Sequence, residues 1–437
     1  MNLHQLGLAR LENKGPVRVG LIGAGKFGSM FLAQVPTSPH VQVAAISDLD
    51  VDKAKAACRN VGWNEDLISQ TQFGDDGLAA CSAPDVEVII DATGNPAAGI
   101  VHARAAIQNG KHVIMVNVEA DVLAGPALAA EARAAGVVYA MAYGDQPALV
   151  CEMVDWARAC GLDVVAAGKG TKYQPHYHNL TPDDVWERFG IDADEAAADG
   201  MNPQMFNSFM DGTKSAIEMA AIANATGLSV PQDGLAFPPS SCLELARHLC
   251  PVSDGGQLAQ KGMVEVVSSM HRGAEDEMAD HLRWGVYVVF EAPNDYTRAC
   301  FQQYGLHTST NGKYGALYRP YHLIGLELNV SVLSAALRGE ATGATRQWRG
   351  DVASVAKRDL KAGDILDGEG GFTVWGKLIP TARSLDTSAL PIGLAHNVAM
   401  VRDVPAGEIV TYGDVKIDEN CAATAFRQEM ERNIYQA

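Results

Sequence analysis

The sequence contains no long apolar run, no cysteine pair with metal-binding spacing and few basic residues. No stretch of about 20 apolar residues occurs, which excludes a transmembrane helix. The opening segment MNLHQLGLARLENKG has no basic region followed by an apolar run, so we expect no secretory signal. The eight cysteines are scattered without CxxC or Cys/His spacing, which favours reduced thiols over disulfides or a zinc site. We therefore expect a cytoplasmic protein.

The charge balance is strongly acidic. The 34 Lys and Arg residues against 52 Asp and Glu residues give a formal charge of −18. Such a surface repels nucleic acids and anionic membranes, so we expect neither as a partner. An anionic small molecule would need a local basic pocket. The 437 residues, 47% of them hydrophobic, indicate a folded protein of two or three domains.

Short apolar segments alternate with alanine-rich helical patterns through the first 150 residues. Fully apolar strands that alternate with helices are typical of a doubly wound parallel sheet, so we predict an α/β Rossmann domain over residues 1–151. The predicted strands are 17–23, 41–48, 86–94, 111–117 and 136–142.

The rest of the chain divides by composition. Residues 152–346 contain a helical stretch at 205–226 and a strand-like run at 286–292 among polar connections, which predicts an α+β catalytic and dimerisation domain. From residue 347 onward turn signals such as KAGD, DGEGG and PAGE dominate. We expect a small β-rich domain over 347–437.

A G-x-G-x-x-G motif follows the first predicted strand. Gly23 permits a tight turn, Gly25 lets the backbone approach a pyrophosphate, and Gly28 lets the helix pack on the strand. The helix N-terminus is then directed at the phosphates, with Lys26 and Phe27 in the same loop. Because the motif stands between a strand and a helical pattern, it predicts a dinucleotide site.

Asp48 ends the second predicted strand, where an acid can accept a hydrogen bond from the ribose 2′-hydroxyl. The same carboxylate would repel the 2′-phosphate of NADP. The residues alone therefore favour NAD(H). Lys53 and Lys55 could still reach a phosphate, although a solvated helix face is the alternative interpretation.

Two segments resemble the homoserine-dehydrogenase-like oxidoreductases: DATGNP at 91–96 and GKHVIMVN at 110–117. The resemblance implies that Thr93, Gly94 and Asn117 surround the nicotinamide end of the cofactor, with Glu119 close by. That group has a lysine directly after the asparagine, where this sequence has Val118 followed by Glu119. The difference argues against homoserine as the substrate.

Six further segments are spread over nearly the whole chain: NVEADVLAG (117–125), YGDQP (143–147), GKGTKY (168–173), FMDGTKSAIEMA (209–220), YRPYHLIGLEL (318–328) and RDLKAGDILDGEGGFTVWGKL (358–378). Together they resemble the 1-deoxy-D-xylulose 5-phosphate reductoisomerase-like oxidoreductases. This closer resemblance implies NADPH-dependent conversion of 1-deoxy-D-xylulose 5-phosphate to 2-C-methyl-D-erythritol 4-phosphate in the methylerythritol phosphate pathway, and a carboxyl-terminal SAF-like domain. The same group includes oxidoisomerases of sugar acids such as apionate.

Five residues of the middle domain are candidates for catalysis. Lys169 and Lys172 stand near glycines after a predicted strand, where a lysine can act as a cation or a general base. Asp211, Lys214 and Glu218 have i, i+3 and i+7 spacing, so a single helix would place them on one face. That face could relay protons or hold Mg²⁺ or Mn²⁺, but surface lysines and a solvated helix face are the alternatives.

Cationic and hydroxyl side chains concentrate between residues 313 and 322. We predict that Lys313 and Arg319 converge on the phosphate or carboxylate of a small sugar substrate. The alternative is an inter-domain hinge with buried tyrosines. The predicted substrate-binding residues are Lys313, Tyr314, Tyr318, Arg319, Tyr321 and His322.

The sequence thus predicts an oxidoreductase acting on a phosphorylated or acidic sugar. The first hypothesis, which the resemblance implies, is a reductoisomerase that uses NADPH. The alternative within enzymes is an NAD-dependent oxidoisomerase or dehydrogenase of a sugar acid. A third hypothesis is a non-catalytic nucleotide-sensing or assembly protein. The sequence leaves the metal ligands unknown, and the resemblance implies a homodimer.

Overall fold

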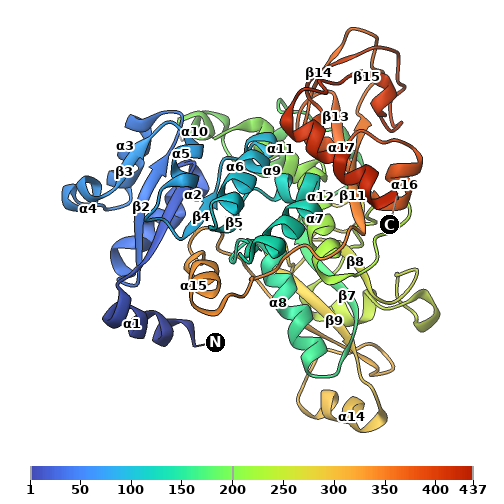
Figure 1. Cartoon of the computed structure of the whole chain (residues 1–437). Coiled ribbons are helices and arrows are strands. Elements are labelled where there is room, and N and C mark those ends of the chain that lie inside the picture. Colours follow the sequence, from blue (N-terminus) through green and yellow to red (C-terminus); the bar gives the residue numbers. More distant parts are fainter. Residues whose placement is uncertain (1, 199–200, 436–437) are drawn as a thin grey trace. The chain divides into compact units, whose positions relative to one another are not determined.

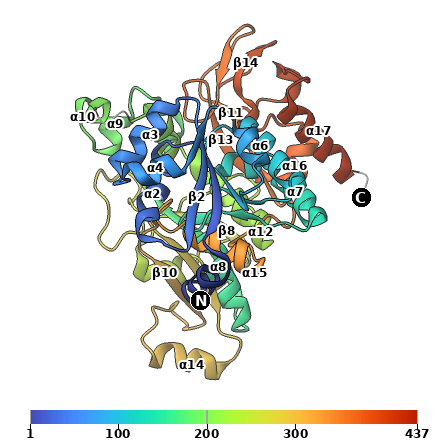
Figure 2. The same cartoon turned by 60° about the vertical axis from the view of Figure 1, so that its left-hand side comes forward.

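The computed structural model describes residues 2–198 and 201–435 (Figures 1 and 2). The chain divides into two compact units. The first unit comprises Met1–Leu149, His322–Arg346 and Cys421–Ala437, and the second comprises Val150–Tyr321 and Gln347–Asn420. These units differ from the three predicted ranges. The chain returns to the first unit twice. The β-rich segment after residue 346 belongs to the same unit as residues 150–321.

The first unit is built on a six-stranded parallel sheet in the order β3-β2-β1-β4-β5-β6. Its apolar strands are almost wholly buried, as expected for a parallel sheet with covered faces. The predicted Rossmann fold is confirmed. The three-residue edge strand β3 was not predicted. The strands are β1 (Val17–Ile22), β2 (Val41–Ser47), β3 (Gln72–Gly74), β4 (Val88–Asp91), β5 (His112–Met115) and β6 (Tyr139–Met141).

Helices from the start and the end of the chain belong to the first unit. The late helix α15 packs on strands β1, β4, β5 and β6, and the last helix α17 packs on α6 and α7. The helices are α1 (Leu3–Lys14), α2 (Lys26–Gln34), α3 (Val51–Asn60), α4 (Glu65–Gln70), α5 (Gly77–Ser82), α6 (Pro96–Gln108), α7 (Val118–Ala135), α15 (Asn329–Arg338) and α17 (Ala422–Tyr435). Helix α8 (Gln146–Ala159) runs across the division between the units.

The second unit contains a mixed four-stranded sheet in the order β10-β9-β7-β8. Strands β7 and β8 are parallel, while β9 is antiparallel to both β7 and β10. One face of this sheet carries a core that includes Val165, Leu245, Leu249 and Tyr287. The strands are β7 (Asp163–Thr171), β8 (Met263–Ser268), β9 (Val286–Glu291) and β10 (Tyr314–Arg319), and the helices are α9 (Val185–Phe189), α10 (Ala193–Ala198), α11 (Pro203–Met210), α12 (Thr213–Thr226), α13 (Leu245–His248) and α14 (Asp295–Gln303).

The chain after residue 346 adds the expected β-rich region to the second unit. Strands β11 and β13 form an antiparallel pair, and β12, β14 and β15 form a small antiparallel sheet. Helix α12 packs on the β11–β13 pair and also on β7 and β8. The elements are β11 (Gly350–Ala356), β12 (Ile365–Asp367), β13 (Val374–Pro380), α16 (Thr381–Asp386), β14 (His396–Met400) and β15 (Val415–Lys416).

The helix predicted over residues 205–226 is two helices. Helix α11 ends at Met210 and α12 begins at Thr213. Between them Gly212 has a φ of 90°, in the left-handed region that favours glycine and ends a helix. Asp211 therefore lies in the turn, and the prediction that it shares one helical face with Lys214 and Glu218 is wrong.

Within the described residues no helix is both long and apolar enough to cross a membrane.

Both units contain buried polar side chains. Asp121 is a buried acid of the first unit and is 1% exposed. Its carboxylate accepts hydrogen bonds from Tyr139 Oη at 2.9 Å and from Thr345 Oγ1 at 3.0 Å. Burial raises the pKa of Asp121 to about 6 from its ordinary 3.8.

This raised pKa predicts a pH-dependent stability. A carboxyl whose pKa is higher in the folded state contributes stability below the unfolded pKa, and this contribution is lost as the pH rises through about 6. Between pH 5 and pH 8 the free energy of unfolding of the wild type should fall by about 1 kcal/mol relative to Asp121→Asn, which keeps an acceptor oxygen for both hydroxyls. Urea unfolding of both proteins at the two pH values measures the difference, and parallel pH dependences would contradict it.

Candidate active site

The glycine loop of the first unit has the geometry of a phosphate-binding turn. Gly23 has a φ of 91°, and a Cβ at this position would lie 2.8 Å from the Ala92 carbonyl oxygen. A Cβ at Gly28 would lie 2.2 Å from the Gly23 oxygen, so only glycine permits this packing of α2. By contrast, nothing lies within 4 Å of a Cβ built at Gly25. This open space at the N-terminus of a nine-residue helix fits a dinucleotide pyrophosphate.

Asp48 holds this loop in place. Its Oδ2 accepts a hydrogen bond from the Ala24 backbone N–H at 2.8 Å, and its Oδ1 accepts one from the Asp50 N–H at 3.0 Å. The carboxylate is therefore fixed beside the phosphate-binding turn, where it suits a ribose hydroxyl better than a phosphate. Lys53, the alternative phosphate ligand, is exposed on α3, and Lys55 is half-buried.

Asn117 and Thr93 form a buried network at the carboxyl ends of β4 and β5. Thr93 Oγ1 donates to Asp91 Oδ1 at 2.9 Å, and Asn117 Nδ2 donates to the Asn95 carbonyl at 2.8 Å. The Asn117 side chain also caps α7 by accepting from the Ala120 N–H, and the residue is only 2% exposed. These internal bonds indicate that Asn117 shapes the loop of residues 91–95.

The other four residues predicted to contact the cofactor lie around the same end of the sheet. Lys26 is exposed at the first position of α2, whereas Phe27 packs against the apolar core. Gly94 has a φ of 66° in the loop after β4, with open space around it. Glu119 is half-buried in the first turn of α7. Lys26 and Gly94 are thus the more accessible of the four.

Lys169 and Glu218 form a buried ion pair in the second unit. Strand β7 continues to Thr171, so Lys169 lies within the strand, and the prediction that it follows the strand is wrong. Its ammonium donates to Glu218 Oε2 from α12, and the two side chains are 8% and 5% exposed. A nearly dry lysine–carboxylate pair can both donate and accept a proton.

The two positions that flank Lys169 require glycine for steric reasons. A Cβ at Gly168 would lie 1.9 Å from the Glu265 carbonyl oxygen, and a Cβ at Gly170 would lie 1.9 Å from the Leu282 oxygen. Only glycine therefore allows the neighbouring backbones to approach here. The two glycines let the strand pass between these segments while Lys169 extends toward α12.

Lys172 and Lys214 differ in their position relative to this pair. Lys172 Nζ donates to the Arg188 carbonyl of α9 at 2.8 Å, and burial, together with the nearby Arg283 guanidinium, lowers the pKa of Lys172. Lys214 is half-buried on α12, one turn before Glu218 and on the same side of the helix. Lys214 thus lies one turn from Glu218, while Lys172 contacts α9.

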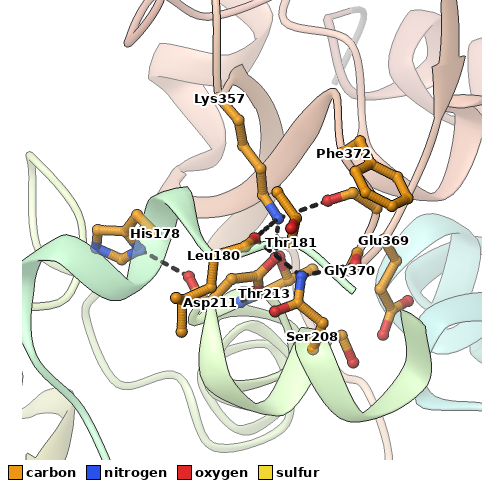
Figure 3. Close-up of polar contacts among 12 residues, drawn as sticks. His178, Leu180, Thr181, Ser208, Asp211, Thr213, Lys357, Glu369, Gly370 and Phe372 are labelled. Atoms are coloured by element: carbon orange, nitrogen blue, oxygen red, sulfur yellow. Dashed lines mark hydrogen bonds and ion pairs between the residues drawn. The ribbon is translucent and has the colours of Figure 1, made fainter. Parts of the chain in front are cut away.

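Asp211 is sealed from solvent. It is 0% exposed, its Oδ2 lies 2.8 Å from Lys357 Nζ, and its Oδ1 accepts from the Thr213 N–H at 2.9 Å (Figure 3). Sequence reasoning named Asp211 but missed Lys357, which stands 146 positions later and has no local motif of its own. A lysine in an otherwise apolar strand pattern (GDVASVAK) was the available signal.

Lys313 and Tyr314 are engaged by acidic side chains. Lys313 Nζ lies 3.1 Å from Glu291 Oε1 and 3.6 Å from Asp254 Oδ2. Hydrogen bonds to Tyr314 and Glu291 raise the pKa of Lys313. The fully buried Tyr314 donates its hydroxyl to Asp254 at 2.5 Å. Two carboxylates already oppose the single charge of Lys313, which does not suit a binding site for a substrate anion.

The strand register also separates Lys313 from Arg319. Tyr314 pairs with Glu291 and Arg319 pairs with Val286, so Lys313 directly precedes β10 and Arg319 ends it, about 20 Å apart along the backbone. The predicted convergence of Lys313 and Arg319 is therefore wrong. Strand pairing over six residues decides this distance, and sequence proximity does not.

Arg319 instead lies in the row of Lys169. Val286 pairs with Arg319 on one side and with Lys169 on the other. Directly paired residues point to the same face of a sheet, and two strand spacings separate these Cα atoms by roughly 10 Å. Arg319 also lies 5.4 Å from the centre of the Tyr321 ring. This row brings an arginine to the face that carries the Lys169–Glu218 pair.

The last two predicted substrate residues lie elsewhere. Tyr318 pairs with Tyr287, one position away from the row of Arg319, and so faces the opposite side of the sheet. His322 begins the segment assigned to the first unit.

Across residues 2–198 and 201–435, no group of three His, Cys, Asp or Glu side chains is placed to hold a metal ion. The residues present thus do not fit an all-protein Mg²⁺ or Mn²⁺ site.

Comparison with protein families supports the class of protein that the fold and glycine loop define. Residues 17–142 match the oxidoreductase family with an NAD-binding Rossmann fold, also termed GFO/IDH/MocA. Residues 144–328 match the catalytic domain of oxidoreductase DRL. The two matches together indicate an NAD(P)-binding oxidoreductase of the DRL family. No curated protein sequence matches the chain.

Solved structures show similarity at low identity. Myo-inositol dehydrogenase from Lactobacillus casei, in complex with NAD(H) and myo-inositol, is 16% identical over 39% of this chain and 50% of its own, with a TM-score of 0.29. An NAD binding oxidoreductase from Klebsiella pneumoniae is 15% identical over 71% of this chain and 67% of its own, with a TM-score of 0.31. DOX-P reductoisomerase in complex with magnesium is 15% identical over 47% and 57%, with a TM-score of 0.33.

The chain spans about half the length of the first of these structures. At such identities and TM-scores the similarity supports no conclusion about activity. The evidence for function therefore comes from the family matches and from the site itself.

The glycine loop generates a test that separates folding from cofactor binding. Gly25→Ala should keep the stability of the wild type, because its Cβ meets open space, but it should weaken NAD(P)H binding by filling the place of the pyrophosphate. Gly28→Ala should lower the melting temperature as well, because its Cβ would meet the Gly23 oxygen. Nicotinamide fluorescence titration and thermal unfolding measure the two effects. An unchanged NAD(P)H affinity in Gly25→Ala would contradict a pyrophosphate site at this loop.

Proposed function

We propose that this protein is an NAD(P)-dependent reductoisomerase that rearranges and reduces a small anionic sugar. The first candidate reaction converts 1-deoxy-D-xylulose 5-phosphate, NADPH and a proton to 2-C-methyl-D-erythritol 4-phosphate and NADP⁺. The match of residues 144–328 to the DRL catalytic domain supports it. So does the segment GKGTKY, which carries Lys169.

The buried Lys169–Glu218 pair is the observation on which the proposal depends. Rearrangement needs a base that takes a proton from a substrate hydroxyl and a cation that stabilises the resulting enediolate. Glu218 is assigned as the base and Lys169 as the cation, which then donates a proton to the alkoxide formed on reduction. The nicotinamide, when bound, supplies the hydride. Arg319, in the row of Lys169, is assigned to the anionic end of the substrate.

A second candidate is an NAD-dependent oxidoisomerase of a sugar acid such as apionate. It is favoured by Asp48, whose carboxylate is fixed beside the glycine loop by the Ala24 N–H. A fixed anion at this place repels the 2′-phosphate of NADP. The two candidates share the acid–base pair and differ in cofactor and in the direction of hydride transfer.

The first experiment follows nicotinamide absorbance with purified protein, 1-deoxy-D-xylulose 5-phosphate and either NADPH or NADH, with and without Mg²⁺ or Mn²⁺. Oxidation of NADPH with formation of methylerythritol phosphate supports the first candidate. Absence of turnover with both cofactors rejects it. The second candidate then predicts reduction of NAD⁺ by a panel of sugar acids.

Replacing the acid–base pair tests the mechanism. Glu218→Gln keeps the shape and leaves an acceptor for Lys169 but removes the base, so kcat should fall by about 10²- to 10⁴-fold. Glu291→Gln is the matched control, since Glu291 lies at the opposite end of the sheet against Lys313. Steady-state kinetics of both variants provides the measurement. Equal kcat values in the two variants would reject Glu218 as the base.

Asp48 generates a separate prediction on cofactor choice. Asp48→Ala removes the anion beside the ribose site, so the ratio of NADPH to NADH affinity should rise by at least about tenfold, corresponding to one unfavourable charge contact of 1–2 kcal/mol. Asp50→Ala is the control, because Asp50 caps α3 through the Lys53 N–H. Titration with both cofactors gives the ratio. A ratio that stays constant in Asp48→Ala would show that this carboxylate does not select the cofactor.

A further inference from the structure

Helix α12, which carries Glu218, is packed between two layers of the second unit. On one side it contacts β7 and β8, and on the other it contacts the β11–β13 pair of the carboxyl-terminal region. Nearly all of its residues are buried, including the polar Thr213, Ser215 and Asn224. The orientation of Glu218 therefore depends on polar contacts inside this packing.

A single buried lysine of the carboxyl-terminal region anchors the start of the helix. Lys357 Nζ lies 2.8 Å from Asp211 Oδ2 and donates to the carbonyl oxygens of Leu180 and Gly371, both at 2.7 Å (Figure 3). Its side chain is 2% exposed. The two carbonyl contacts are hydrogen bonds, and the contact with the carboxylate is an ion pair. The lysine thus joins three segments that lie far apart in the sequence.

Asp211 connects Lys357 to the first residue of α12. Its Oδ1 accepts the Thr213 N–H at 2.9 Å, at the first residue of the helix. Its backbone oxygen lies 2.7 Å from His178 Nδ1, which must be the protonated nitrogen because a carbonyl only accepts. His178 in turn stacks on Trp375 of β13 at a centroid distance of 3.8 Å. The turn before α12 is therefore held by its side chain and by its backbone.

Two further contacts from the same region fix the helix. The Gly376 N–H donates to Thr213 Oγ1 at 2.8 Å near the start. Near the end, Asn224 Oδ1 accepts from the Arg349 N–H at 2.7 Å and from the Gly350 N–H at 2.9 Å. Residues 349–376 thus hold α12 at both ends.

We propose that the carboxyl-terminal β region positions the acid–base helix, with Lys357 as the central positioning residue. This proposal rests on the proposed function of Glu218. Replacing both partners of a buried ion pair by apolar residues is often neutral for stability, whereas losing one partner leaves an uncompensated buried charge, so Asp211 must stay at Lys357. Glu218 lies five residues after Thr213, about 7.5 Å along the axis, so a small rotation of α12 moves its carboxylate away from Lys169. A misplacement of about 1 Å can lower a rate 10²-fold.

The test compares two Lys→Met substitutions in the same region of the full-length protein. Lys357→Met removes the anchor, whereas Lys361→Met removes a lysine that forms an exposed ion pair with Asp403. With substrate, Lys357→Met should lower kcat at least about tenfold, leave KM within about twofold and shift a limb of the pH profile of kcat. Lys361→Met should match the wild type in all three. A wild-type kcat and pH profile in Lys357→Met overturns the proposal.

Thr213→Val provides a milder second variant should Lys357→Met fail to fold. It keeps the side-chain volume and removes the acceptor for the buried Gly376 N–H, so kcat should fall about threefold or more while the melting temperature falls by only about a few degrees. An unchanged kcat in Thr213→Val, with Lys357→Met unfolded, counts against the proposal.

Amide hydrogen exchange separates a failure of this proposal from a failure of the proposed function. Exchange within residues 213–226 should be faster in the folded Lys357→Met protein, or in Thr213→Val, than in Lys361→Met, whether or not any substrate is turned over. If the wild type turns over no substrate, the function fails while exchange still tests the positioning. If exchange and kcat are both unchanged, the positioning role fails and the function stands.

Discussion

The structure depends most on the need to satisfy charges that are buried in the second unit. Lys357 is held by a carboxylate and two carbonyl oxygens, and Lys169 by Glu218. Removing an ammonium from water is costly unless each proton meets an acceptor, so the segments that supply these oxygens must stay together. The carboxyl-terminal region and the four-stranded sheet are thereby joined through α12, and Glu218 is presented at Lys169.

The two units illustrate different ways of building a site. In the first unit, close approach of backbone segments determines the shape of the glycine loop, since a Cβ at Gly23 or Gly28 would overlap a neighbouring backbone oxygen. In the second unit, the two residues of the proposed acid–base pair come from a strand and a helix that are distant in sequence, and the glycines at 168 and 170 only give Lys169 its place in β7. The cofactor motif is consequently local in sequence, whereas Lys169 and Glu218 are 49 residues apart.

This difference explains which predictions succeeded. The Rossmann strands and the glycine loop follow from local apolar patterns and a short motif, and the structure confirms both. Lys169 and Glu218 were identified as separate candidates, but their contact depends on how α12 packs against β7. Asp211 was placed on the wrong element because Gly212 ends the helix pattern in a left-handed turn. Arg319 was matched with Lys313 because the two are close in sequence, although an extended strand carries them to opposite ends.

By itself, the sequence determined the fold class, the dinucleotide site and the set of residue types available for acid–base chemistry. Each of these depends on interactions within a few residues or on the repeating burial pattern of strands and helices. Only the tertiary structure decided which residues meet: Lys169 with Glu218, Arg319 in the row of Lys169, and Lys357 with Asp211. Strand register and helix packing set these contacts, and both arise from the whole core, so no local pattern encodes them.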